Sequence, residues 1–245
     1  MTGTVYLVGA GPGAADLLTV RALRILRRAD VVLVDRLVPA AVLEVVPPTA
    51  EVVDVGKVAG GDHDETQRWI HELMVTHAAK GATVVRLQGG DPMVLGRGGE
   101  ELDHLRAAGV AFEVVPGVSS AVGVPAAVGL ALTLRNVASG FAVVAGEALS
   151  ESDWARYAAV DTLVVLMGVR RRVETACHLV AAGRRRDEPV VFIERGTTPA
   201  ERCVVATLAG VAAGAVAVTA PAVWVIGDVV AAWGGAPLSW VQAGR

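Results

Sequence analysis

Short apolar runs alternate with amphipathic stretches along the first 115 residues, and this alternation constrains the fold most. Runs such as Val5–Val8 are valine-rich and too short for helices, which favours strands. Stretches such as Asp64–Ala79 place apolar residues at helical spacing. Strands separated by helices pair in parallel, so we expect an α/β fold with a largely parallel sheet covered on both faces. The predicted strands are Val5–Val8, Val31–Val34, Val52–Val55, Thr83–Leu87 and Ala111–Val115, and the predicted helices are Asp16–Arg28, Asp64–Ala79 and Glu100–Ala108.

Pro116-Gly117 interrupts this alternation, and we expect a domain boundary there, with domains at 1–115 and 116–245. A small-residue helix at Val118–Val128 should follow. Further strands and helices then alternate, which predicts a second α/β domain. Its strands are expected at Phe141–Ala145, Thr162–Met167, Pro189–Ile193, Arg202–Ala206 and Ala222–Ile226, and its helices at Ser152–Ala159, Arg170–Ala182 and Thr207–Gly214.

The composition excludes several classes of protein. Hydrophobic residues make up 53% and charged residues 19%, which indicates a packed core. A net charge of −3 gives no general basic field for nucleic acid. Two cysteines without a CxxC pair indicate no metal site. Two uncharged runs, 114–134 and 203–227, contain glycine and proline and are predicted to be buried strand and helix, not membrane spans. With no signal peptide evident before the first strand, we expect a cytoplasmic protein.

A glycine-rich turn, Gly9–Ala14, joins the first predicted strand to the first predicted helix. It fits the pattern GxGxxA, and Asp35 ends the next strand, which is the context of a nicotinamide dinucleotide site. A nicotinamide-dependent oxidoreductase is therefore one alternative, and a turn without a ligand is another. Pro12 argues against a dinucleotide because it removes an N–H that would bind phosphate. Asp16, expected to cap the helix, would bring negative charge towards the phosphates.

More glycine-rich segments follow other predicted strands. Gly89–Pro92 reads GGDP and runs into GRGGEE at Gly96–Glu101. Four glycines around Arg97 would let a bulky ligand approach the backbone. The loop follows the fourth strand, at the edge where open α/β sheets bind ligands. Other segments near the ends of predicted strands belong to the same pattern. They are Val34–Val38, Val55–Lys57, Pro116–Ser120, Leu166–Gly168, Glu194–Pro199 and Gly227–Val230.

The order and spacing of these segments resemble the tetrapyrrole (precorrin) methylase family from about Val5 to Val230. The resemblance implies two α/β domains with the active-site cleft between them. It also implies a homodimer that uses S-adenosylmethionine and no metal to methylate uroporphyrinogen III twice, giving precorrin-2. Another precorrin-type tetrapyrrole as substrate, and a binding protein without turnover, remain alternatives. One departure is Gln88, where the family commonly has a lysine before GGDP.

The resemblance also implies roles for individual residues. Asp35 matches the proton acceptor and Lys57 the proton donor; Lys57 is one of two lysines beside twenty arginines, and an amine can lose a proton where a guanidinium cannot. Arginine forks would suit the carboxylates of the macrocycle. The implied donor contacts are Pro12, Gly89, Gly90, Asp91, Val94, Ser119, Ser120, Met167 and Gly196, and the implied macrocycle contacts are Arg97, Glu100, Arg135 and Met167.

Overall fold

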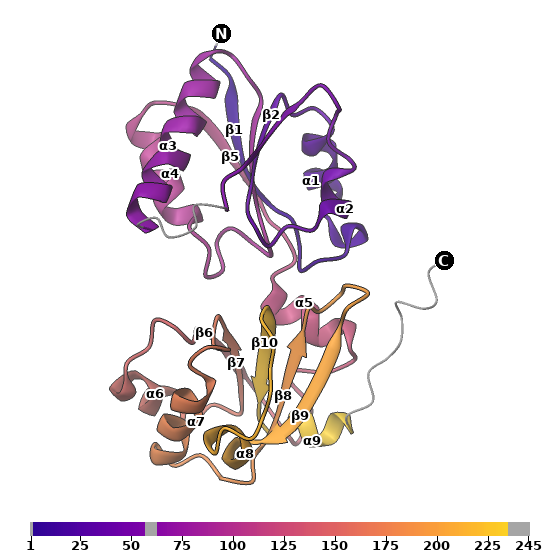
Figure 1. Cartoon of the computed structure of the whole chain (residues 1–245), viewed down its shortest axis with the longest axis vertical. Coiled ribbons are helices and arrows are strands. Elements are labelled where there is room, and N and C mark those ends of the chain that lie inside the picture. The colour runs from indigo at the N-terminus through magenta and orange to yellow at the C-terminus, as the bar shows by residue number, and fades with distance from the viewer. Residues whose placement is uncertain (1, 57–62, 235–245) are drawn as a thin grey trace. The chain divides into compact units, whose positions relative to one another are not determined.

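The computed structural model describes residues 2–56 and 63–234 and divides the chain into two compact units, Met1–Ser120 and Ala121–Arg245. The predicted boundary lay five residues earlier, before Pro116. Each unit contains one five-stranded sheet with helices packed against it (Figure 1). The predicted α/β class is confirmed. Within the described ranges, no helix has the length and apolar character needed to cross a bilayer.

The sheet of the first unit is entirely parallel, with the strand order β3-β2-β4-β1-β5. Successive side chains of a strand point to opposite faces. One face packs on α1 and α2 and the other on α3 and α4 (Figure 1). The strands are β1 (Thr4–Gly9), β2 (Val31–Val34), β3 (Glu51–Asp54), β4 (Val84–Gln88) and β5 (Ala111–Val115), and the helices are η1 (Ala15–Leu17), α1 (Val20–Leu26), α2 (Ala40–Leu43), α3 (His63–Ala79) and α4 (Gly98–Ala107).

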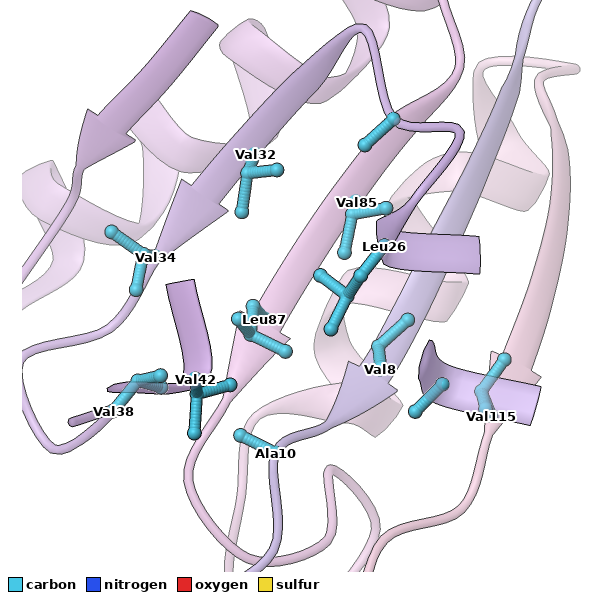
Figure 2. Close-up of a cluster of buried hydrophobic side chains, with 12 residues drawn as sticks. Val8, Ala10, Leu26, Val32, Val34, Val38, Val42, Val85, Leu87 and Val115 are labelled. Atoms are coloured by element: carbon cyan, nitrogen blue, oxygen red, sulfur yellow. The ribbon is translucent and has the colours of Figure 1, made fainter. Parts of the chain in front are cut away.

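Valine and leucine side chains fill both faces of this sheet. On the α1 and α2 side, Val8, Val85 and Leu87 meet Leu26 and Val42 in a buried cluster (Figure 2). Burying such a side chain contributes roughly 1.5–3 kcal/mol. The central strand β4 is buried along its whole length. This rigid sheet positions the loops that follow its strands.

The first helix begins later than predicted. Residues 15–17 form a short 3-10 turn, and α1 starts at Val20 with Thr19 as its N-cap. The Thr19 hydroxyl accepts a hydrogen bond from the Ala22 N–H at 3.1 Å. The prediction that Asp16 caps this helix is therefore wrong: threonine caps a helix as aspartate does, and Leu18 between them is extended.

The sheet of the second unit is mixed, with the order β6-β7-β10-β8-β9. Strands β6 and β7 are parallel, whereas the other neighbours are antiparallel. Trp224 stacks on Phe192 with ring centroids 4.8 Å apart in the core. The strands are β6 (Phe141–Ala145), β7 (Thr162–Leu166), β8 (Pro189–Glu194), β9 (Arg202–Thr207) and β10 (Ala222–Ile226), and the helices are α5 (Ser120–Ala127), α6 (Glu151–Tyr157), α7 (Arg172–Ala181), α8 (Leu208–Ala212) and α9 (Val229–Trp233).

Candidate functional site

The motif segments of the first unit gather at one edge of its sheet. All five strands are parallel, so their carboxyl ends meet at the same edge. The glycine turn follows β1, Asp35 follows β2, Gly89–Asp91 follows β4 and Pro116–Ser120 follows β5. Segments far apart in the sequence thus become neighbours at the edge where open α/β sheets bind ligands.

Three of these loops pack backbone against backbone. Gly11 N–H donates to Gly90 O at 3.1 Å, and Gly90 N–H donates to Gly11 O at 2.7 Å. A Cβ on Gly9 would lie 2.6 Å from the Gly90 carbonyl oxygen and from Gly117 Cα. Glycine is required at Gly9 by this close approach, and at Gly90 by its φ of +69°.

This packing is unfavourable for a dinucleotide. The Gly11 N–H is already bonded to Gly90, and Pro12 has no N–H to offer. The helix that should present its N-terminus to a pyrophosphate begins only at Val20. The GxGxxA turn therefore serves to join two loops of the sheet edge.

Asp91 fastens two of the loops together. Its Oδ1 accepts a hydrogen bond from Met93 N–H at 2.7 Å, and its Oδ2 accepts one from Gly117 N–H at 2.9 Å. A carboxylate that accepts two backbone N–H groups is held firmly in place. The Asp91 side chain thus has a structural role at the edge, to which any contact with a ligand would be added.

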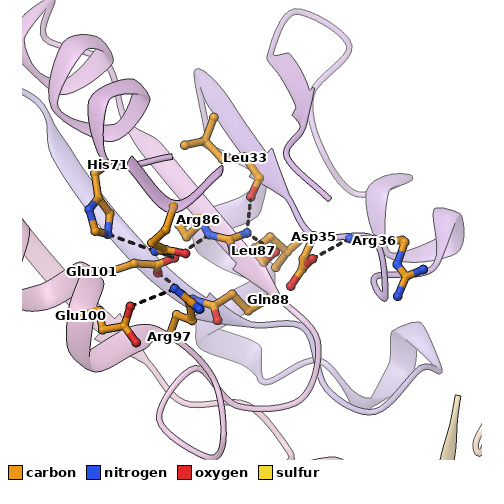
Figure 3. Close-up of polar contacts among 11 residues, drawn as sticks. Leu33, Asp35, Arg36, His71, Arg86, Leu87, Gln88, Arg97, Glu100 and Glu101 are labelled. Atoms are coloured by element: carbon orange, nitrogen blue, oxygen red, sulfur yellow. Dashed lines mark hydrogen bonds and ion pairs between the residues drawn. The ribbon is translucent and has the colours of Figure 1, made fainter. Parts of the chain in front are cut away.

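Asp35 lies half-buried at the end of β2. Its N–H donates to Leu87 O at 3.1 Å, and its Oδ1 accepts from Arg36 N–H at 2.8 Å (Figure 3). A Cβ on Gly56 would overlap the backbone and Cβ of Arg36, so glycine lets the end of the β3 loop reach this place. Lys57, the next residue and the implied proton donor, lies outside the described residues.

The two arginines implied in macrocycle binding are both accessible to solvent. Arg97 Nη1 lies 3.1 Å from Glu100 Oε2 at the start of α4; the Arg97 side chain is 42% exposed and the Glu100 side chain 61%. An exposed pair of this kind contributes about 0–1 kcal/mol, so an anionic ligand can displace it at little cost. Arg135, in the second unit, is exposed beside Asn136.

In the second unit, Met167 and Gly196 also come to one sheet edge. Strands β7 and β8 both run antiparallel to β10, so their carboxyl ends lie on the same side. Met167 follows β7 and is 48% exposed, and Gly196 lies just beyond β8. The segment Gly227–Val230 follows β10 and so lies at the opposite edge, where a Cβ on Gly227 would be 2.5 Å from Asp161 O. Its glycine is explained by packing.

Backbone strain marks the same segments in both units. A positive φ is costly for residues other than glycine and persists mainly where function requires it. Among the described residues, each non-glycine residue with positive φ lies in or beside a motif segment or next to Arg135. They are Leu95 (52°), Asn136 (63°), Met167 (54°), Arg195 (45°) and Thr197 (64°). Leucine, methionine, arginine and threonine do not favour positive φ, so the strain at those four positions could not be predicted from the residue types.

A buried polar network lies behind the edge of the first unit, and sequence analysis missed it. Glu101 is fully buried and accepts hydrogen bonds from Arg86, Gln88 and Gln67 (Figure 3). Gln88 therefore points into the interior and is only 5% exposed, so it leaves no gap in the binding surface. The available signal was a charged residue inside an apolar strand, Arg86 in the run Thr83–Leu87.

Comparisons with known proteins agree on one family. The family model for Tetrapyrrole (Corrin/Porphyrin) Methylases matches residues 4–212. The S-adenosyl-L-methionine-dependent uroporphyrinogen III methyltransferase of Methanosarcina barkeri is 45% identical over 236 residues, which cover 93% of this chain and 92% of that protein. The siroheme synthase of Acinetobacter baylyi is 44% identical over 93% of this chain but only 51% of its own length. The chain thus spans about half the length of several curated relatives.

Solved structures give the same result. A uroporphyrin-III C-methyltransferase from Thermus thermophilus, complexed with S-adenosyl homocysteine, is 51% identical over 93% of both chains, with a TM-score of 0.82. A cobalt precorrin-4 methyltransferase is 29% identical over 93% of this chain and 95% of its own, with a TM-score of 0.79.

Proposed function

This chain belongs to the tetrapyrrole methylase family, and we propose that it transfers methyl groups from S-adenosylmethionine to carbons of uroporphyrinogen III, giving precorrin-2 after two transfers. The observation that carries the proposal is the 51% identity, over 93% of both chains, with a uroporphyrin-III C-methyltransferase solved with S-adenosyl homocysteine. The glycine turn, which left a nicotinamide cofactor as an alternative, instead binds the backbone of Gly90.

The loops of the first unit suit a ligand that approaches the backbone. A Cβ on Gly89 would meet Leu37, whose Cβ would be the nearest atom at an ordinary 3.4 Å, so packing alone does not require glycine there. A methyl donor lying against this backbone would require it. Gly90 lies beside Ser119 and Ser120, since its Cβ would be 3.5 Å from Ser120 N. We assign the donor to Pro12, Gly89, Gly90, Asp91, Val94, Ser119 and Ser120 of the first unit and to Met167 and Gly196 of the second.

The reaction needs a base. A pyrrole carbon attacks the sulfonium methyl, the C–C bond forms, and the C–S electron pair leaves with sulfur as S-adenosylhomocysteine. The ring is then positively charged and must lose a proton. We assign this proton to Asp35, whose Oδ2 accepts no hydrogen bond from a described residue. Lys57 stays the predicted proton donor, and the macrocycle is assigned to Arg97, Glu100, Arg135 and Met167.

Thermal unfolding with candidate ligands tests the proposal. At 100 times its dissociation constant, a ligand adds about 2.7 kcal/mol to the free energy of unfolding. S-adenosylhomocysteine should therefore raise the melting temperature, whereas NAD should not. Formation of S-adenosylhomocysteine should then require uroporphyrinogen III. Turnover with another precorrin but not with uroporphyrinogen III would assign the substrate to that alternative, and stabilisation by NAD alone would contradict the proposal.

We also propose a cytoplasmic homodimer that associates through the second unit. Val122 and Phe141 are each 41% exposed and line one apolar hollow together with Leu132. Large apolar side chains gathered on a surface indicate association. Light scattering should give twice the chain mass for the wild type and the single chain mass for Phe141→Arg. A monomeric wild type would contradict this assignment.

A further inference from the structure

We propose that the buried pair Arg86–Glu101 is a positioning pair for Asp35, which fixes the backbone that carries this residue and balances the charge behind it. The inference rests on the proposed function, since it takes Asp35 as the proton acceptor. Neither Arg86 nor Glu101 belongs to the residues assigned above to the donor or the macrocycle.

Arg86 connects the ends of two strands. Its Nε donates to Glu101 Oε1 at 3.0 Å, and its Nη1 lies 3.5 Å from both Leu33 O and Leu87 O (Figure 3). Leu87 O also accepts the Asp35 N–H at 3.1 Å. The Leu87 carbonyl therefore accepts hydrogen bonds from both Arg86 and Asp35. The second carbonyl that Arg86 contacts belongs to Leu33, two residues before Asp35.

Glu101 connects the ends of β2 and β4 to helix α4, which begins within the GRGGEE segment. It lies on α4, one residue after Glu100, and is fully buried. Its Oε2 accepts from Gln88 Nε2 at 2.7 Å, and Gln88 is the residue before Gly89. A single carboxylate thus joins the start of α4, the end of β4 and, through Arg86, the end of β2.

Stability alone does not explain a charged pair at this position. Replacing a buried ion pair with apolar residues of similar size is often neutral or stabilising, whereas removing one partner is strongly destabilising. Two residues earlier on the same face of β4, Val84 packs in the apolar core. Apolar residues at positions 86 and 101 together would therefore satisfy the fold, and stability does not explain why a charged pair lies beside Asp35.

The charges around Glu101 are linked to Asp35. Burial raises the pKa of Glu101, Arg86 opposes this rise, and the negative charge of Asp35 adds to it.

Other titratable groups also face this network. On the α3 side, Gln67 contacts His71, which stacks on His104 of α4 with the ring centroids 4.4 Å apart. Burial and His104 lower the pKa of His71, which favours its neutral form. Glu100 and Arg97 at the start of α4 form their own exposed pair.

Two variants separate charge from position. Glu101→Gln leaves the Arg86 charge unbalanced, so the Asp35 carboxylate should keep its negative charge to lower pH than in the wild type. Arg86→Met/Glu101→Leu removes both charges and also the bonds to Leu33 O and Leu87 O. Because the two opposite charges are removed together, this double variant should leave the charge of Asp35 at a given pH as it is in the wild type. It should nevertheless slow methyl transfer about 10- to 100-fold, because small displacements of a reacting group are costly.

The second unit offers a matched control. Arg184 and Glu188 form another buried pair, with Nη2 and Oε1 2.6 Å apart, and Arg184 Nη1 also donates to the Val160 carbonyl. They precede β8 and therefore lie at the edge opposite Met167 and Gly196. Arg184→Met/Glu188→Leu should change the melting temperature but leave methyl transfer within about twofold.

The experiment measures single-turnover formation of S-adenosylhomocysteine, donor affinity, and the pKa of the Asp35 carboxyl by ¹³C NMR, assigned with Asp35→Asn. Slow transfer with unchanged donor affinity in the first double variant, together with the pKa shift in Glu101→Gln, supports the proposal. Wild-type transfer by that double variant, or an unshifted Asp35 in Glu101→Gln, overturns it. Failure of the proposed function would show differently, as a wild type that does not methylate uroporphyrinogen III, and the NMR titration could still be read.

Discussion

The two units have the same size of sheet and each contains a buried Arg–Glu pair, yet they use them differently. In the first unit all strands are parallel, so the loops that follow the strands all lie at one edge of the sheet. The pair Arg86–Glu101 lies directly behind that edge. In the second unit the sheet is mixed, and the pair Arg184–Glu188 lies at the edge away from Met167 and Gly196. The position of a buried charge relative to the site edge thus indicates its role better than its burial does.

The site edge of the second unit is held by other means. Glu194 is fully buried and accepts bonds from Arg202 and from Thr219 N–H, which fixes the end of β8. The following loop then carries positive φ angles at Arg195 and Thr197. In the first unit the buried pair positions the side chain that we propose as the base, whereas in the second unit it is strained backbone that is positioned, and this contrast can be tested residue by residue.

The largest effect is expected at the proposed base. Asp35→Asn should lower single-turnover methyl transfer about 10²–10⁴-fold, because the amide cannot accept the proton. Asp161→Asn is the matched control: Asp161 accepts bonds from Ser139 and precedes β7, away from the site edge of its unit. It should leave the rate unchanged within about twofold. Equal losses of the transfer rate in Asp35→Asn and Asp161→Asn would show that the carboxyl edge of the first sheet is no more important for the reaction than the strand end at Asp161.

Gly90→Val should weaken donor binding about 100-fold or more, because a β-branched residue at a φ of +69° is strained and would project beside Ser120. The control is Gly214→Val, at a similar φ of +72° in open space of the second unit. Calorimetric titration with S-adenosylhomocysteine should show a loss of affinity in the first variant only. If both variants merely lost stability with unchanged affinity, Gly90 would serve the fold and not the ligand.

Much of this arrangement was predictable from the sequence. Each of the ten described strands lies within one residue of its predicted bounds, because short valine-rich runs between turn residues give a strong local signal. The short helices α2 and α9 span only four and five residues and show too little periodicity to predict. Helix starts were also less certain, as the shift from Asp16 to Val20 shows.

The buried network was harder to find because it depends on contacts between distant residues. Glu100 and Glu101 are adjacent and chemically identical, yet the first side chain is 61% exposed and the second is buried. The position of Glu101 along the helix does predict its burial. It lies four residues before the buried Leu105, on the face of α4 that packs against the sheet. The partner Arg86 is fifteen residues away along the chain and could be assigned only from the fold.

Arg97→Ala and Arg135→Ala compare the two units as sources of macrocycle contacts. Each should weaken the tetrapyrrole by roughly 1.5–3 kcal/mol and leave the methyl donor nearly unaffected, since a charge-assisted contact is lost. Arg106→Ala, which removes a similar exposed pair with Asp103 on α4, should change neither affinity. Equal losses for donor and tetrapyrrole would mean that Arg97 and Arg135 act on the structure.

The smallest effect concerns the pH dependence of stability, where the two buried glutamates should act in opposite directions. Hydrogen bonds from Arg202 lower the pKa of Glu194 below its ordinary value. Its contribution is therefore present above the pKa of the unfolded chain and is lost as the pH falls through the folded pKa. Burial raises the pKa of Glu101, so its ionisation in the folded protein is unfavourable, and stability is regained as the pH falls from the folded to the unfolded pKa.

Melting temperatures measured from pH 7 to pH 4 should reveal this difference. Glu194→Gln removes a group that destabilises the protein on acidification, so its melting temperature should fall less than that of the wild type. Glu101→Gln removes a group with the opposite effect, so its melting temperature should fall more, each by about a few degrees. Parallel curves for the two variants would contradict the assignment of opposite environments. Opposite deviations would support a first unit that keeps a destabilised carboxylate beside its base and a second unit that uses its buried carboxylate for stability.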